Sequence, residues 1–422
     1  MIKLSTKINW KDYLTVVIIF AFFPPILLER LSDTMNKLQI MLQIAMMCLL
    51  FVMIILKRQL IIRKHTLMCW GVFCLYGLLI TFFLAPNMIY PYCVNVIMPI
   101  FEVILICINY QNEENGMERL TKCMTFYWCF LILANLALLF LFPSGIIRST
   151  AGATHDRANW LIGSKNNIVF PMVFAGTLIL NSIHQGTKKK RLFHYGILLI
   201  AGYEILASGA NGMSFGGGST TGLVAYMLLF VLFAMRGIMH KTNLDARLSI
   251  IFVAVLFLII TVLLVHGATN PNSMFAKVAG MLGKDSTGSG RTEVWPEVVP
   301  LFLQSPILGN GFITRTFNGS LTSTYNFYLD LAYRYGICGI CLMMLVFASY
   351  TKMGRPELYS MHLDRLDSLT FMIGFICLMV CGLVNTIRWQ WLAMMLELYA
   401  YADECDYIRV TQPWIPILKE NL

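Results

Sequence analysis

The segment 288–312, GSGRTEVWPEVVPLFLQSPILGNGF, brings charged and glycine residues together in a chain that is otherwise strongly apolar. Arg291 is followed by an apolar run at 298–302, a pattern that predicts a short helix lying at a membrane surface. A guanidinium at the start of such a helix suits a pyrophosphate, because its planar fork makes two charge-assisted hydrogen bonds with phosphate oxygens. A solvated surface arginine is the alternative. Pro296 and Pro300 interrupt the pattern, so we expect a break or kink.

Other polar and aromatic side chains could join Arg291 in a site. His155 lies in a polar segment and is able to act as a general base, since a free imidazole has a pKa of about 6.5. A solvated loop histidine is the alternative. Trp295 is suited either to stacking on a sugar ring or to anchoring the surface helix in lipid. Further positive charge is available from Arg157, Lys165, Arg315 and Arg388.

Asp330 and Arg334 are four residues apart in an apolar segment, so a helix would place them on one face. Charged side chains inside a membrane are costly and normally face a partner or a cavity. The two residues therefore form either a structural ion pair or a contact with substrate, and Glu102 has the same two interpretations. Asn167 is placed to bond a sugar or a neighbouring helix.

The composition identifies an integral membrane protein, because 58% of the 422 residues are hydrophobic and only 13% are charged. A helix needs roughly 20 mostly apolar residues to cross a bilayer, and runs of this kind are helices rather than strands. The expected fold is therefore all-α, with about twelve transmembrane helices. They are expected at 12–28, 38–56, 66–85, 92–110, 120–142, 161–183, 193–207, 219–235, 248–266, 325–347, 367–384 and 389–402.

The distribution of Lys and Arg predicts the orientation of the bundle, since short cytoplasmic loops hold the excess of positive charge. Most of these residues fall on one side when both termini are cytoplasmic, so the net charge of +10 needs no nucleic-acid partner. We expect a single membrane domain in the cytoplasmic membrane, with nine helices in 1–266, one large extracytoplasmic loop at 267–324, and three helices and a cytoplasmic tail in 325–422. Long ordered loops usually carry function.

The twelve cysteines lie mostly in apolar runs and are expected to pack as small hydrophobic residues. Cys338 and Cys341 have CxxC spacing, but no second pair accompanies them, so no metal site is expected.

Three short motifs follow one another around the large loop. They are Gly290 and Arg291 with Trp295, the PILGNG run at 306–311, and N-x-Y-L at Asn326, Tyr328 and Leu329 followed by YGICG at 335–339. In order and placement they resemble the O-antigen polymerase and ligase family. The resemblance implies a glycosyltransferase of the C type whose donor is an undecaprenyl pyrophosphate-linked glycan. It implies lipid-linked oligosaccharide as donor and acceptor, membrane lipids and polysaccharide assembly proteins as partners, and no cofactor or obligatory metal.

The resemblance also suggests which residues form the site. Family ligases usually place a His before the Asn of the third motif, where this chain has Tyr325, and often carry an Arg after the Gly-rich loop, where it has 216–222, GGGSTTG. Either other residues replace these groups or the donor binds differently. The expected catalytic residues are Arg291, Tyr325 and His155. The expected substrate-binding residues are Gly290, Trp295, Gly309, Gly311, Arg315, Asn326, Tyr328, Asp330, Arg334, Arg157 and Asn167.

The resemblance favours a polymerase that joins lipid-linked repeat units into capsular, O-antigen or exopolysaccharide on the outer face of the membrane. A ligase of the same fold differs only in its acceptor and is the first alternative. A lipid-linked oligosaccharide flippase or other transporter is the second. Transporters usually show internal repeats and short outer loops, whereas this sequence has one dominant outer loop and no detectable repeat.

Overall fold

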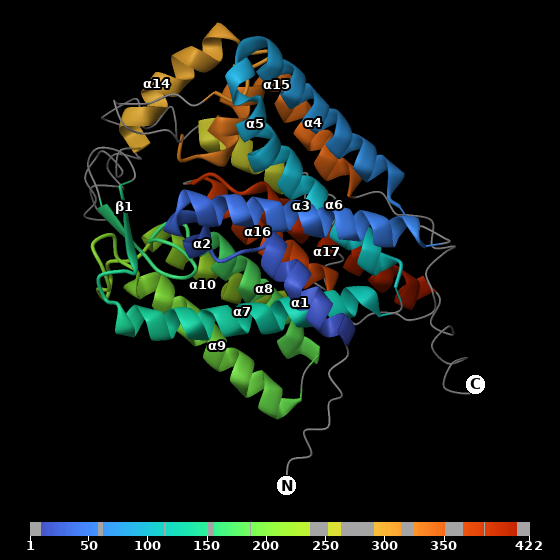
Figure 1. The fold of residues 1–422 in the computed structure, drawn as a ribbon, viewed down its shortest axis with the longest axis vertical. Coiled ribbons are helices and arrows are strands. Elements are labelled where there is room, and N and C mark those ends of the chain that lie inside the picture. Colours follow the sequence, from blue (N-terminus) through green and yellow to red (C-terminus); the bar gives the residue numbers. More distant parts are fainter. Residues whose placement is uncertain are drawn as a thin grey trace.

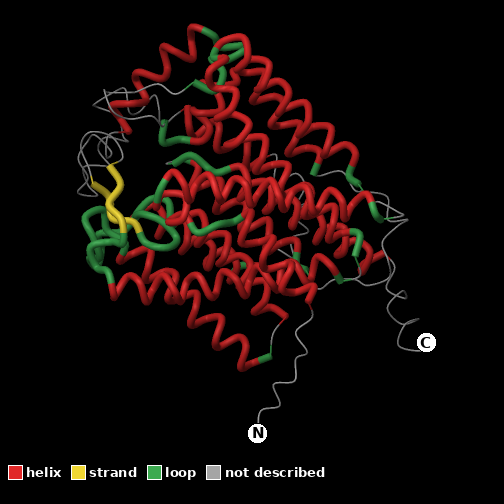
Figure 2. Tube along the Cα trace, viewed as in Figure 1, coloured by secondary structure: helices red, strands yellow, loops and turns green. Residues whose placement is uncertain are grey.

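The structure is a computed structural model that describes residues 10–57, 62–113, 115–150, 156–185, 187–236, 252–262, 291–313, 324–350, 366–383 and 385–411. Helices account for 79% of it, which confirms the predicted all-α class. Many of the long helices run side by side in a bundle, with α14 and strand β1 toward the left of the view in Figure 1. Figure 2 shows a small two-stranded sheet beside the helices.

The named helices are α1 (Trp10–Phe22), α2 (Ile26–Leu31), α3 (Asp33–Ile55), α4 (Lys64–Leu84), η1 (Pro86–Met88), α5 (Ile89–Tyr92), η2 (Cys93–Ile97), α6 (Met98–Gln111), α7 (Gly116–Leu141), α8 (Val169–Gln185), α9 (Lys188–Ala207), α10 (Thr220–Ala234), α14 (Arg291–Gln304), α15 (Phe327–Ser349), α16 (Ser368–Gly382) and α17 (Trp389–Thr411). The strands β1 (Ile147–Thr150) and β2 (Asp156–Asn159) pair antiparallel as a hairpin.

Five helical segments in the described part of the chain are long and apolar enough to cross a membrane, and several shorter apolar helices accompany them. Large apolar side chains are exposed along α3, α4 and α7, as expected where the solvent is lipid. The chain is therefore an integral membrane protein. Every predicted span overlaps a helix, but the number twelve and the orientation remain predictions. So does the division at 267–324, because much of that loop lies outside the described residues.

Several boundaries differ from the prediction. The first span is two helices, because Pro24 and Pro25 separate α1 from α2 and proline cannot donate to a helical ladder. The sixth begins at Val169 rather than at 161, and the preceding turn is closed by hydrogen bonds from the Asn167 and Ile168 amides to the Ser164 carbonyl. The predicted helix is confirmed as α14 and continues through Pro296 and Pro300, so the predicted break is wrong. Its position at a membrane surface remains a prediction.

Helix α17 lies at the centre of the core. It packs mainly against α16 and α6. The ring centroid of its Trp391 lies 5.1 Å from those of Phe23, which follows α1, and Phe174 of α8, and 5.4 Å from that of Trp128 of α7. Residues 391–396 are almost completely buried. Arg388, the residue before α17, contacts Glu29 of α2, and α2 in turn contacts strand β1 of the hairpin.

A buried ionic network connects α4 with α17. The Arg63 guanidinium lies 3.1 Å from the Glu397 carboxylate and 2.9 Å from that of Glu404. The Tyr350 hydroxyl donates to Glu397 at 2.8 Å and accepts from the Trp70 indole at 2.8 Å. Pairing and hydrogen bonding compensate for the cost of burying these charges.

Candidate active site

Helix α15 is interrupted at Gly336, where φ is 63° and ψ is −167°. The freed amides of Ile337 and Cys338 donate to the carbonyls of Pro306 and Ile307 at 2.9 and 3.1 Å. In return, the Gly311 amide donates to the Arg334 carbonyl at 2.9 Å. Backbone polar groups at membrane depth must find partners inside the protein, and these bonds supply them. We call residues 306–311 and 333–338 together the Gly336 junction.

Glycine is required at this junction because two backbone segments approach each other too closely for a side chain to fit between them. A Cβ atom on Gly336 would lie 2.3 Å from the Ile307 carbonyl oxygen, and one on Gly309 would lie 2.4 Å from that of Arg334. Both residues also have positive φ, which glycine adopts without strain. PILGNG and YGICG are thus two halves of one structural unit, and in this arrangement Gly309 and Gly311 shape the backbone.

Helix α14 packs on the first turns of α15. Trp295 is 1% exposed, and its indole N–H donates to the Thr324 carbonyl at 2.9 Å. Leu329 and Tyr333 complete this cluster. Protein encloses the Trp295 ring on all sides, so stacking on a sugar would require the contact between α14 and α15 to open.

Asp330 and Arg334 form the predicted ion pair, with the Arg334 Nε 3.0 Å from the Asp330 Oδ1. The Arg334 guanidinium also lies 4.3 Å from the centre of the Phe312 ring, within the range of a cation–π contact. Arg334 therefore connects α15 with the residue that follows the PILGNG run, and Asp330 pairs with Arg334 within α15.

The third motif connects α15 with the loop that follows α16. The Asn326 side chain caps α15 by accepting from the Leu329 amide at 2.9 Å, and it donates to the Leu383 carbonyl at 2.9 Å. The Tyr328 hydroxyl donates to the Met379 carbonyl at 3.0 Å. Both side chains are buried, at 0 and 2% exposure, so here they position the loop that leads to Arg388.

The remaining predicted residues have different placements. Tyr325 is half-buried and has a φ of 51°, a strained conformation of the kind that clusters at functional sites. Asn167 is half-buried in the turn before α8. Arg291 is the first residue of α14 and Arg157 belongs to β2, but the side chains of both lie outside the described part of the structure. His155, Gly290 and Arg315 lie wholly outside it.

A cavity of about 540 Å³ opens between α2, α3, the segment from α5 to α6, and the start of α17. We call it the charged groove. Its charged lining residues are Glu29, Arg30, Asp33, Lys37 and Arg388. One wall includes the π-helix η2, a type of helix that is rare and frequent at functional sites. The volume is in the range of cavities that hold small ligands.

Two contacts order the charged end of this groove. The Arg388 guanidinium donates to both oxygens of Glu29 at 2.8 Å, which engages two of its five N–H groups. Arg30 donates to the Asn159 side-chain oxygen at 2.7 Å, connecting α2 with the hairpin. Segments from near the two ends of the chain, represented by Glu29 and Arg388, therefore meet the hairpin residue Asn159 at this end of the groove.

The motif residues support both walls of the groove. Tyr92, which lies beside η2, has its ring centroid 5.8 Å from that of Phe312. On the other wall, Trp389 follows Arg388 and packs 5.6 Å from the ring of Phe327, at the start of α15. These ring contacts connect the end of the Gly336 junction and the start of α15 with the two walls of the groove.

Glu102 lies in α6 one helical turn beyond Met98, and it is not among the residues that line the groove. The side chain is 1% exposed, and within the described residues its Oε1 has no hydrogen-bond partner. The described residues therefore do not support the interpretation of Glu102 as a member of an ion pair.

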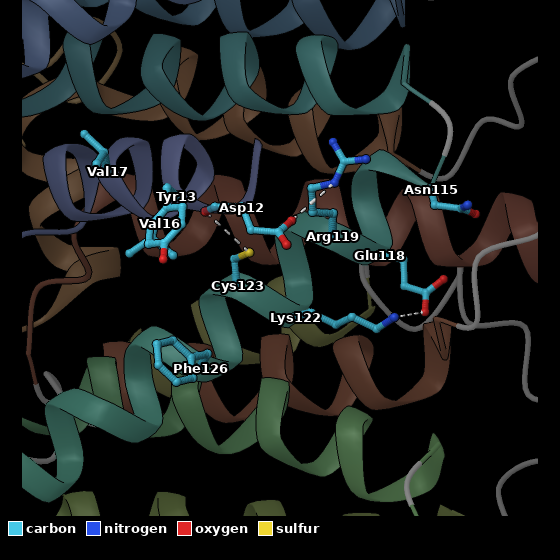
Figure 3. Close-up of a pocket in the computed structure, with 10 residues that line it drawn as sticks. All are labelled: Asp12, Tyr13, Val16, Val17, Asn115, Glu118, Arg119, Lys122, Cys123 and Phe126. Carbon is cyan, nitrogen blue, oxygen red and sulfur yellow. Dashed lines mark hydrogen bonds and ion pairs between the residues drawn. The ribbon is translucent and has the colours of Figure 1, made fainter. Parts of the chain in front are cut away.

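A larger cavity of about 750 Å³ lies between α1 and α7 (Figure 3). Its charged side chains contact one another: Arg119 lies 3.7 Å from Asp12, and Lys122 lies 2.5 Å from Glu118. Its lining residues include none of the three motifs. The smaller charged groove is the better candidate because the motif residues position its walls.

Sequence reasoning missed the part of Glu29, Arg30 and Lys37 in this groove. The available signal was the paired proline at 24–25, which marks a break in an apolar run with charged residues directly after it. The sequence contains nothing that pairs Glu29 with Arg388.

Fold and groove together define an all-helical integral membrane protein with a charged cavity at one end of its bundle. A family model described as O-antigen ligase matches residues 205–344. The match confirms the predicted resemblance to the O-antigen polymerase and ligase superfamily, and it includes α14, the Gly336 junction and most of α15. No curated protein and no solved structure matches the chain.

Proposed function

We propose that the protein is a polymerase that joins polyprenyl pyrophosphate-linked repeat units into a polysaccharide. The observation that carries this proposal is the match to the O-antigen ligase family over the segment that builds the Gly336 junction. The family supports glycosyl transfer from a lipid-linked saccharide, and the exposed apolar helices supply the membrane setting that such substrates need. A ligase of the same fold is the second candidate, favoured by the description of the matched family.

The reaction is a displacement at the anomeric carbon of the donor. An acceptor hydroxyl attacks that carbon and gives its proton to a general base. The bond from carbon to the pyrophosphate oxygen breaks, and polyprenyl pyrophosphate leaves with the electron pair. Fixed positive groups beside the leaving oxygens stabilise the charge that develops on them. We assign this part to Arg291. We assign the general base to His155, and Tyr325 stands where family ligases usually have a His.

The distribution of Lys and Arg supports the proposal that the end with the hairpin, α14 and the charged groove lies outside the cytoplasm. Lipid-linked repeat units would then be joined on the outer face of the membrane. Orienting two large lipids supplies much of the rate enhancement expected of such an enzyme, because it replaces an encounter between two molecules by a reaction of bound groups.

The test is chain extension by purified protein supplied with a synthetic polyprenyl pyrophosphate-linked repeat unit and analysed as a gel ladder. We expect wild type to produce a ladder and Arg291→Ala to remain folded and produce none. Arg148→Ala is the matched control, since Arg148 is an exposed arginine in β1 that does not line the groove. A full ladder from Arg291→Ala refutes the assigned role. Absence of a ladder from wild type with its cognate unit would favour the ligase or the flippase.

A further inference from the structure

The lining of the charged groove changes along its length. On α3 the lining begins with Asp33 and Lys37 and continues with Ile40 and Gln43. Ten residues of helix correspond to roughly 15 Å, so the charged and uncharged ends are well separated. The opposite wall continues past Val94 to Met98 and Pro99 without a charge among its lining residues. The groove is thus charged at one end and uncharged at the other.

The charged end has an excess of positive charge. Three cations, Arg30, Lys37 and Arg388, accompany two carboxylates, Glu29 and Asp33. Glu29 engages two N–H groups of Arg388 and thereby fixes the direction of the guanidinium. Oriented arginine with a nearby lysine is a combination that recognises phosphate groups. A pyrophosphate carries more negative charge than a phosphodiester and fits three cations better.

The uncharged end adjoins the apolar surface of the bundle. Leu38, Met41 and Ile44 on α3 are 53, 65 and 50% exposed. In an integral membrane protein such a surface contacts lipid chains. A water-soluble pyrophosphate compound would make no use of this end, whereas an amphiphile would occupy the whole groove.

We propose that the charged groove binds the pyrophosphate of a polyprenyl-linked substrate at Arg388 and Lys37, with the polyprenyl chain running between α3 and η2 toward lipid. This inference rests on the proposed function for the chemical identity of the lipid. Glu29 is a positioning residue that orients Arg388. The Gly336 junction and α15 act indirectly, since they support the two walls.

The experiment measures equilibrium binding of radiolabelled undecaprenyl pyrophosphate to the full chain in phosphatidylcholine nanodiscs. We expect Arg388→Ala to weaken binding about tenfold or more, because a charge-assisted contact is lost. Val94→Trp, which fills the uncharged end, should also weaken it, and Ile40→Trp repeats this test from the other wall. The controls are Arg148→Ala and Val224→Trp, the latter on an exposed position of α10. Both should bind like wild type.

Competition identifies the ligand chemistry. Inorganic pyrophosphate should compete weakly, and Val94→Trp should not change the concentration at which it competes. Phosphatidylglycerol should compete poorly. If inorganic pyrophosphate competes as well as the lipid, the assignment of the uncharged end is wrong. If phosphatidylglycerol competes equally, the assignment of the pyrophosphate is wrong. Wild-type affinity in Arg388→Ala overturns the proposed site.

Chain extension by the same variants separates this inference from the proposed function. If wild type produces a ladder and the groove variants bind lipid and extend chains normally, the groove is rejected and the polymerase is retained. Altered lipid binding by the groove variants, without a ladder from wild type, would reject the polymerase and retain the groove as a lipid pyrophosphate site.

Discussion

Replacing Gly336 by alanine should destabilise the protein, because the backbone at this position excludes a side chain. Its φ of 63° and ψ of −167° fall in a region that is essentially limited to glycine. The added Cβ would lie 2.3 Å from the Ile307 carbonyl oxygen and 2.6 Å from the Gly309 amide nitrogen. Both contacts are with backbone atoms. These atoms can move away only if the two segments of the junction, 306–311 and 333–338, separate.

The size of the effect follows from two contributions. A residue other than glycine in this conformation costs about 1–3 kcal/mol. Separation of the chains would also weaken the hydrogen bonds from Ile337 and Cys338 to Pro306 and Ile307, each worth about 0.5–1.5 kcal/mol. The free energy of unfolding should therefore fall by about 2–6 kcal/mol.

The assay is an unfolding titration with SDS in mixed micelles, comparing Gly336→Ala with two other glycine variants. Gly71→Ala and Gly196→Ala are the controls, since a Cβ at either position of α4 or α9 would meet no heavy atom within 4 Å. Alanine is the better helix former, so the controls should be neutral or stabilised by up to about 1 kcal/mol. If Gly336→Ala unfolds at the same SDS concentration as the controls, the interpretation of the junction is refuted.

Two further substitutions test contacts that connect distant parts of the chain by the same titration. Arg63→Met should cost about 3–5 kcal/mol, because it leaves the buried carboxylates of Glu397 and Glu404 without their cation; a loss below 1 kcal/mol would contradict this account. Asn326→Ala should cost about 1–3 kcal/mol through loss of the cap and of the bond to the Leu383 carbonyl, whereas Asn326→Ser keeps a neutral capping oxygen and should cost less. Equal effects of the two Asn326 variants would show that the cap contributes little.

The sequence predicted the helices well because their signal is local. A run of apolar residues such as Asp33–Ile55 satisfies its own backbone as a helix whatever surrounds it. The surface helix α14 was also predictable, since its apolar residues recur within one short segment. Boundaries were less predictable, because turns such as that at Ser164 depend on specific hydrogen bonds rather than on hydropathy.

The parts played by the motif residues were not predictable in the same way. Trp295, Asn326 and Tyr328 were expected to contact substrate, and the structure places all three in buried contacts that hold α14, α15 and the end of α16 together. A sequence motif shows which residue types occur together, but it does not distinguish a side chain that touches a ligand from one that supports the site.

The sequence by itself determined the membrane setting, the helical class and the family resemblance, because hydropathy and motif order are properties of neighbouring residues. Only the tertiary structure decided that the PILGNG run closes the break at Gly336 and that Arg388 meets Glu29 in one groove. The latter two residues are 359 positions apart. The physical reason is that such contacts depend on how whole helices pack, and no local preference of the chain specifies which distant residues that packing brings together.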